Sequence, residues 1–122
     1  QVLITGDMSF SYDVNGLSST YLSPRFKIIV MCNGGGGIFR FIKPTSDLPE
    51  LETCFEIHRD ISVEKYADLF GLRYFELNDE KSAAEVLSLF FAEKDRPAIL
   101  AVHTPNVYNA EVLRGYFRRS RQ

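Results

Sequence analysis

The fold of this chain is decided by the stretch FKIIVMCNGGGG, residues 26–37. Its first seven residues form a nearly continuous apolar run, which is typical of a strand buried on both faces of a parallel sheet. The run stops at Asn33 and four glycines. A second β-rich run, at residues 2–5, stops in the same way at Gly6 and Asp7. The sequence therefore predicts two strands whose carboxyl ends carry small or polar residues.

The rest of the chain alternates between short β-rich runs and helical stripes, which indicates an α/β domain. Further strands are expected at residues 72–77 and 98–103. Helices are expected at residues 11–22, 62–70 and 79–93, and from about residue 109. Residues 34–61 read as a long irregular loop, of a kind that is usually functional or mobile. We expect a three-layer α/β/α fold with a mainly parallel sheet.

The spacing of apolar residues also predicts which helical side chains face the core. The expected inward side chains are Val14, Leu17, Tyr21, Val63, Tyr66, Ala67, Phe70, Ala83, Leu87, Phe90, Phe91, Ala110, Leu113 and Phe117. The last helix also carries four arginines, which we interpret as a solvated helix end where cations complement the helix dipole. These arginines are Arg114, Arg118, Arg119 and Arg121.

Composition sets the broad class of the protein. The 122 residues suit one domain, and the net charge of −2 gives no general reason to bind nucleic acid. No apolar run approaches the roughly 20 residues that span a bilayer. Both cysteines, Cys32 and Cys54, are expected to be reduced thiols of a cytoplasmic protein. Because the chain opens within a strand, we expect it to be part of a longer protein whose missing domains lie upstream.

Asp7 is a candidate ligand for a divalent cation. A carboxylate just past a strand suits Mg²⁺, which takes one or two protein carboxylates and completes its shell with phosphate oxygens and water. Ser9 and the backbone N–H groups of a following helix could hold phosphate. The alternative is that Asp7 merely caps that helix.

Asn33 and the glycines after it strengthen the metal interpretation. An amide oxygen is a suitable hard ligand, and glycines let the backbone approach a phosphate without Cβ obstruction. The alternative is a flexible loop. Two other glycine motifs are excluded, because Phe39 and Arg40 stand where a dinucleotide-binding motif needs its third glycine, and no Lys-Ser/Thr pair completes a P-loop.

These residues resemble the metal–diphosphate motif of thiamine-diphosphate enzymes, with Asp7 and Asn33 at the metal-ligand positions. The family usually has two asparagines at the end of the second strand, and Cys32 replaces the first. The stretches GDMSFSYDVNGL, residues 6–17, and NGGGGIF, residues 33–39, are similar to the menaquinone-pathway synthases of the MenD type. Those enzymes decarboxylate 2-oxoglutarate on thiamine diphosphate and add the succinyl carbanion equivalent to isochorismate.

The resemblance implies roles for individual residues. Mg²⁺ would be held by Asp7, Asn33 and the backbone carbonyl of Gly35. Phe39 would form an apolar wall beside the substrate, although ordinary loop packing is the alternative for this ring. The cofactor would be contacted by Gly6, Met8, Ser9, Gly36 and Ile38.

The resemblance also implies partners. In this family a glutamate from another domain of the partner subunit activates the cofactor, and nothing in this chain matches it. We therefore expect no catalytic residue here, a chain that is inactive alone, and a homo-oligomeric complete enzyme with its N-terminal domains. Two alternatives stay open: another thiamine-diphosphate 2-oxo-acid decarboxylase or acetolactate-synthase relative, and a non-catalytic α/β module that binds a phosphorylated ligand or a protein.

Overall fold

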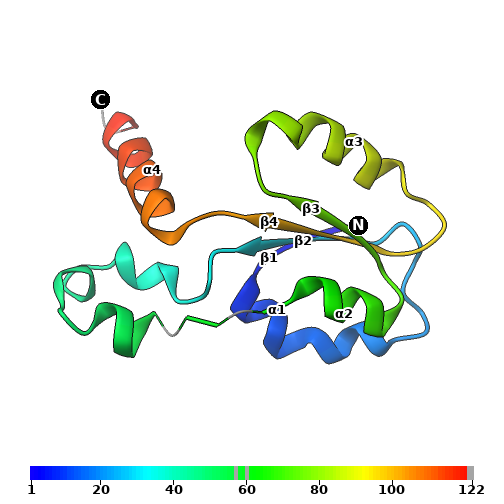
Figure 1. Ribbon diagram of the computed structural model, residues 1–122, viewed down its shortest axis with the longest axis horizontal. Coiled ribbons are helices and arrows are strands. Elements are labelled where there is room, and N and C mark those ends of the chain that lie inside the picture. The colour runs from blue at the N-terminus through cyan, green and yellow to red at the C-terminus, as the bar shows by residue number, and fades with distance from the viewer. Residues whose placement is uncertain (57, 60, 121–122) are drawn as a thin grey trace. The chain divides into compact units, whose positions relative to one another are not determined.

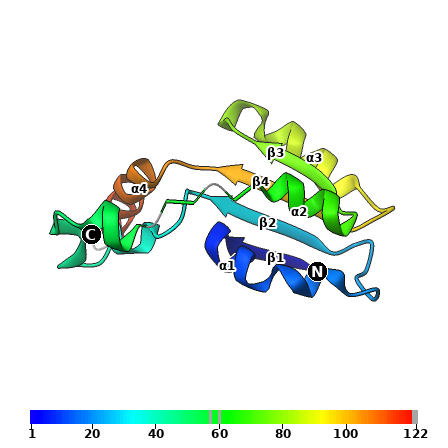
Figure 2. The same cartoon turned by 60° about the horizontal axis from the view of Figure 1, so that its bottom comes forward.

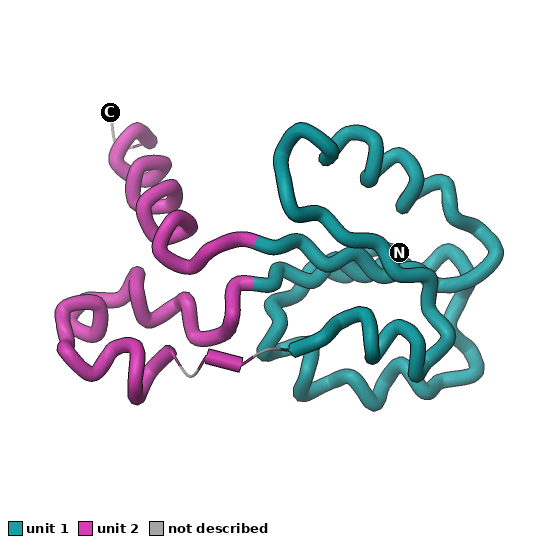
Figure 3. Tube along the Cα trace, viewed as in Figure 1, with its two compact units in different colours: residues 1–32, 61–103 teal, residues 33–60, 104–122 magenta. Residues whose placement is uncertain are grey.

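The computed structural model describes residues 1–56, 58–59 and 61–120. The chain divides into two compact units, which Figure 3 shows in two colours. Residues 1–32 and 61–103 form the first, which we call the sheet unit. Residues 33–60 and 104–122 form the second, which we call the loop–helix unit.

The sheet unit has the predicted three-layer α/β/α architecture. Its four strands are parallel and lie in the order β1-β2-β4-β3. Figures 1 and 2 show α1 and α2 on one face of this sheet and α3 on the other. The strands are β1 (Val2–Gly6), β2 (Lys27–Cys32), β3 (Arg73–Leu77) and β4 (Ala98–His103), and the helices are α1 (Asp7–Asp13), α2 (Val63–Phe70) and α3 (Ala83–Ala92).

The central strands β2 and β4 build the core of the sheet unit. Their side chains alternate between the two faces, so Ile28 and Ile99 pack with Phe10 on the side of α1 and α2. Leu100 points the other way and packs with Phe90 of α3. All five of these side chains are buried. The near-continuous apolar run of β2 therefore reflects burial on both faces, as the sequence predicts.

Helix α2 has the ends that the sequence indicates. The Ser62 hydroxyl accepts a hydrogen bond from the Lys65 N–H at 3.3 Å, which caps the first turn. Gly71 ends the helix in the left-handed conformation, with φ of 69°. Both signals are local, so they could be recognised without knowing the packing.

Several predicted positions are wrong. The first helix begins at Asp7 instead of Ser11, and after Asp13 the chain tightens into a 3-10 turn at Val14–Ser18. Tyr21 lies beyond that turn and is exposed instead of inward. Phe91 is half exposed because α3 presents Phe90 to the sheet.

The described residues of the loop–helix unit form short turns and a long helix. The described residues between 34 and 61 are irregular as expected, with 3-10 turns at Gly37–Arg40 and Thr45–Asp47 and a π turn at Leu51–Phe55. Helix α4 spans Asn106–Arg119 and begins three residues earlier than predicted, because the Asn109 N–H already donates to the Pro105 carbonyl. Arg121 of the arginine cluster lies outside the described residues. None of the helices in the described part of the chain has the length and apolar character needed to cross a membrane.

Candidate functional site

Asp7 directly follows strand β1 and begins helix α1. It is the first residue of the helix and only 4% exposed. Its Oδ1 accepts a hydrogen bond from the Met8 N–H at 2.7 Å. Gly6 holds the cap position of α1, so Asp7 is not its N-cap residue, although the Asp7 side chain bonds an N–H of the first turn. A buried carboxylate at this place needs compensation from hydrogen bonds or a cation, since burial penalises its charge.

The carboxyl edge of the sheet brings Asp7 close to the end of β2. Strands β1 and β2 are parallel neighbours with Gly6 opposite Met31, and β2 ends one residue later at Cys32. Burial raises the pKa of the Cys32 thiol to about 11, and the negative charges of Asp7 and Glu76 add to the effect. The thiol is therefore protonated at neutral pH, which disfavours it as a metal ligand.

In the loop–helix unit, Asn33 and Gly35 are fixed by hydrogen bonds. The Asn33 side-chain oxygen accepts from the Gly35 N–H at 3.0 Å and closes a tight turn. The Gly35 carbonyl accepts from the Asn106 side-chain amide at 2.9 Å. Asn106 could not be recognised from the sequence, because it is 71 residues away from Gly35 and has no recognisable spacing to it. Carbonyl oxygens have two lone pairs, so these bonds leave both oxygens able to bind a cation.

The glycine run is a packed structure, so the interpretation as a merely flexible loop is incomplete. Gly36 has φ of 63°, a conformation that favours glycine. A Cβ atom there would lie 2.6 Å from Glu56 Cα and 2.8 Å from the Phe55 carbonyl oxygen. A Cβ on Gly37 would overlap the Asn106 side chain. Gly36 is therefore required by the local packing of the unit, whatever ligand it binds, whereas a side chain at Gly37 would displace that of Asn106.

A buried ion pair holds the segment that follows the glycines. Arg40 Nε lies 2.6 Å from Glu56 Oε1, and Arg40 Nη2 lies 2.7 Å from Glu52 Oε1. The Glu56 side chain is 8% exposed, whereas that of Glu52 is 73% exposed. The two carboxylates raise the pKa of Arg40. The pair thus ties the 3-10 turn at Gly37–Arg40 to the π turn at Leu51–Phe55.

The remaining predicted residues differ in their surroundings. Met8 is half-buried, and Ser9 is exposed at the start of α1. Ile38 is exposed, whereas the Phe39 ring packs against Phe55 with 5.4 Å between ring centroids. This contact is the loop packing that the alternative for Phe39 describes, and a role beside the substrate stays a prediction.

The predicted site residues fall into two groups. The sheet unit holds the residues around Asp7, and the loop–helix unit holds those around Asn33, so the structure brings together the members of each group. Their joint binding of one ion stays a prediction. No cluster of three or more His, Cys, Asp or Glu side chains suited to a metal is found within the described ranges. The predicted donors are one carboxylate, one amide and one backbone carbonyl, and this oxygen set fits Mg²⁺.

Comparison with known proteins identifies the relatives of this chain. No protein-family model matches it. It is 48% identical over 116 residues to a protein of Porphyromonas gingivalis named 2-succinyl-5-enolpyruvyl-6-hydroxy-3-cyclohexene-1-carboxylate synthase. Proteins of the same name from Flavobacterium johnsoniae and Christiangramia forsetii are 40% and 36% identical over 117 and 115 residues.

These matches cover 94–96% of this chain but only 20–21% of each relative. The chain thus spans about a fifth of the length of the relatives it matches. The similarity is not confined to the two short motifs, since it extends over nearly every residue of the chain. Over nearly all of its length, the chain is therefore similar to one segment of proteins named 2-succinyl-5-enolpyruvyl-6-hydroxy-3-cyclohexene-1-carboxylate synthase.

Proposed function

We propose that this chain is the C-terminal part of the Mg²⁺- and diphosphate-binding domain of a longer, thiamine-diphosphate-dependent synthase. The complete enzyme would decarboxylate 2-oxoglutarate and join the resulting succinyl unit to isochorismate in menaquinone biosynthesis. The name of the relatives supports this reaction, because it describes a succinyl group on a cyclohexene carboxylate. The bound cofactor would supply the electron sink for decarboxylation.

One observation carries the proposal. Asp7 is a buried carboxylate at the carboxyl edge of a parallel sheet, directly beyond Gly6 and beside the strand that ends at Cys32. Ligands of open α/β sheets collect at this edge. In the complete enzyme, Asp7, Asn33 and the Gly35 carbonyl would hold Mg²⁺ against the cofactor's diphosphate. The diphosphate and neighbouring cofactor atoms would be contacted by Gly6, Met8, Ser9, Gly36 and Ile38.

The other residues have orienting roles in this proposal. Asn106 holds the Gly35 carbonyl in place, so it would fix the direction of one metal ligand. Phe39 would exclude water beside the substrate. Proton transfer would be carried by residues outside this chain, which is consequently inactive alone. The complete enzyme would be a cytoplasmic homo-oligomer with its active site completed by the upstream domains and a second subunit.

The metal assignment is tested with the variant Asp7→Ala in the full-length protein. Thiamine-diphosphate binding is measured by calorimetry with Mg²⁺ and with a chelator. We expect Asp7→Ala to abolish the Mg²⁺-dependent binding, because the carboxylate is the charged ligand of the set. Asp13→Ala is the matched control, since Asp13 is an exposed residue at the other end of α1.

Two results would contradict the proposal. Unchanged cofactor affinity in Asp7→Ala, with an unaltered circular dichroism spectrum, would rule out the metal role. Thiamine-diphosphate binding by the wild-type protein that does not depend on the metal would favour the non-catalytic module instead.

The substrate assignment is tested separately: the full-length enzyme should consume 2-oxoglutarate with isochorismate and not pyruvate. Turnover of pyruvate would favour the acetolactate-synthase alternative.

A further inference from the structure

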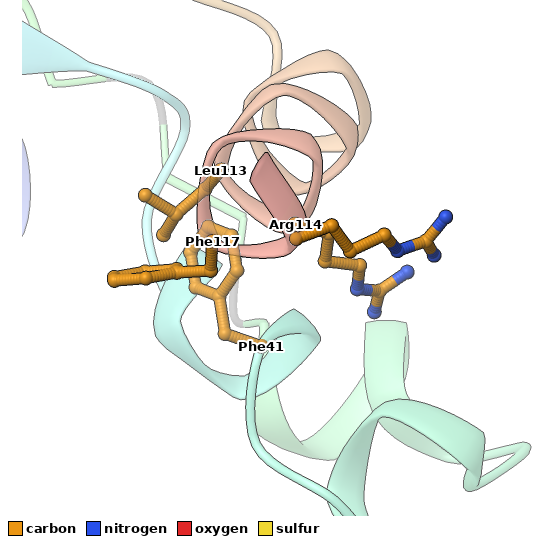
Figure 4. Close-up of a pocket in the computed structure, with 5 residues that line it drawn as sticks. Phe41, Leu113, Arg114 and Phe117 are labelled. Carbon is orange, nitrogen blue, oxygen red and sulfur yellow. The ribbon is translucent and has the colours of Figure 1, made fainter. Parts of the chain in front are cut away.

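A surface groove in the loop–helix unit lies outside every role assigned above. It has a volume of about 350 Å³ and runs between α4 and the segment after the glycine run. Its lining residues, shown in Figure 4, are Phe41, Leu113, Arg114, Phe117 and Arg118. All five belong to the loop–helix unit, and none was predicted to bind cofactor, metal or substrate.

One wall of the groove is apolar. Leu113 and Phe117 are four residues apart on α4 and therefore lie on the same helical face. Figure 4 shows both side chains gathered with the Phe41 ring. The sequence predicts that Leu113 and Phe117 point into a core, yet they are 37% and 55% exposed. The described part of the chain thus leaves an exposed apolar surface along the groove, which a ring-shaped ligand could cover.

The other wall is cationic. Arg114 and Arg118 are also one helical turn apart, and Figure 4 shows the Arg114 side chain extending away from the Phe117 ring, although both line the same groove. An Arg114 N–H donates to the backbone carbonyl of Arg40, whose own side chain is held by Glu52 and Glu56. This contact fixes the direction of the Arg114 guanidinium before any ligand arrives.

In the described part of the chain, no carboxylate forms an ion pair with this wall. Among residues 1–56, 58–59 and 61–120, no ion pair within 4.0 Å involves Arg114 or Arg118. A guanidinium has five N–H donors, so Arg114 keeps several after its bond to Arg40. The pair therefore presents a forked donor surface that matches a carboxylate.

We propose that this groove binds a small organic carboxylate with a planar or near-planar ring. The ring would lie against Phe41 and Phe117, and the carboxylate would be held by Arg114 and Arg118. The volume is at the lower end of small-molecule sites, which span roughly 300–1,000 Å³. The proposal does not depend on Mg²⁺ or thiamine diphosphate.

The probe for this site is 4-fluorobenzoate, titrated into the full-length protein and followed by ¹⁹F NMR. We expect saturable binding that weakens by about tenfold in Arg118→Gln and in Arg114→Gln, the usual effect of losing one charge-assisted hydrogen bond. Arg118→Lys should restore part of the affinity. 4-Fluorobenzyl alcohol, which keeps the ring but lacks the charge, should bind at least about tenfold more weakly than the carboxylate.

Arg119→Gln is the matched control, because Arg119 is an exposed arginine of the same helix that does not line the groove. It should leave the affinity unchanged. Absence of saturable binding would overturn the proposal, including the case in which another segment of the full-length protein fills the groove. Equal weakening by Arg118→Gln and Arg119→Gln would also overturn it, as would binding that neither Arg114→Gln nor Arg118→Gln alters.

Discussion

In the sheet unit, parallel strands bury Ile28, Ile99 and Leu100 completely between two layers of helices. In the loop–helix unit, by contrast, Leu51 and Ala110 are the buried apolar side chains of the described residues. That unit is organised by polar contacts instead, above all the Arg40–Glu56 pair and the bond from Asn106 to Gly35. Apolar burial thus stabilises the sheet, whereas specific hydrogen bonds and ion pairs shape the segment that carries Asn33.

The difference has a functional meaning. A packed sheet gives Asp7 a rigid support, because interiors of this kind resist small displacements. A unit held by few polar contacts opens locally at lower free energy, as ligand-binding segments commonly do. The predicted metal ligands therefore come from one rigid and one more adaptable part of the chain. Variants matched between the two units can test this contrast.

The largest effect is expected from Leu100→Ala in β4. Leu100 is fully buried, so the variant should lower the free energy of unfolding by about 3–5 kcal/mol through lost transfer energy and a cavity. Urea denaturation followed by circular dichroism measures this loss. Leu69→Ala is the control, since Leu69 is an exposed residue of α2. Similar losses in the two variants would mean that β4 is not the centre of the core.

A smaller effect is expected from Gly36→Ala, compared with Gly71→Ala. The two glycines have φ of 63° and 69°, so each substitution should cost about 1–2 kcal/mol for the left-handed conformation. At Gly71 a Cβ meets nothing within 4 Å, whereas at Gly36 it meets the backbone of residues 55–56. Overpacking should bring the total for Gly36→Ala to about 3 kcal/mol.

Hydrogen exchange measures the Gly36 effect where it occurs. Amides of residues 37–40 should lose protection in Gly36→Ala, while those of β4 keep theirs. Gly71→Ala should instead lower the protection of α2. Equal effects of the two substitutions on residues 37–40 would contradict the packing of Gly36 against residues 55–56.

The smallest effect is expected from Glu56→Gln. Removing the charge beside the buried Arg40 Nε should destabilise the loop–helix unit by about 2 kcal/mol. Glu52→Gln alters the exposed partner and should cost less than about 1 kcal/mol. Hydrogen exchange of the amides of residues 37–40 measures the loss of stability in each of the two variants. A larger effect of Glu52→Gln would show that the exposed bond, and not the buried one, holds this turn.

Much of the sheet unit could be predicted from local signals. The apolar run at residues 26–32, the Ser62 cap and the Gly71 stop each depend on neighbours in sequence. The errors at Tyr21 and Phe91 have one cause. Helical spacing tells which residues share a face, but not where a helix ends or how far the sheet extends beneath it.

In the candidate site, too, some residues could be predicted from local signals and others could not. Asp7, Asn33 and the four glycines could be recognised from residue type and order alone, because strand ends and glycine runs are local patterns. Asn106, the Arg40–Glu56 pair and the groove beside Phe117 could not. They depend on contacts between residues from 16 to 76 positions apart, and nothing in their spacing marks them.

The sequence by itself determined the α/β class, the parallel strands and the polar ends of β1 and β2, because periodicity and chain-breaking residues act over a few positions. Only the tertiary structure decided that Asp7 is buried, that Asn106 holds the Gly35 carbonyl and that Leu113 and Phe117 lie open beside two arginines. Burial and long-range hydrogen bonds depend on which segments come into contact after folding. Local sequence patterns do not indicate which distant segments those are.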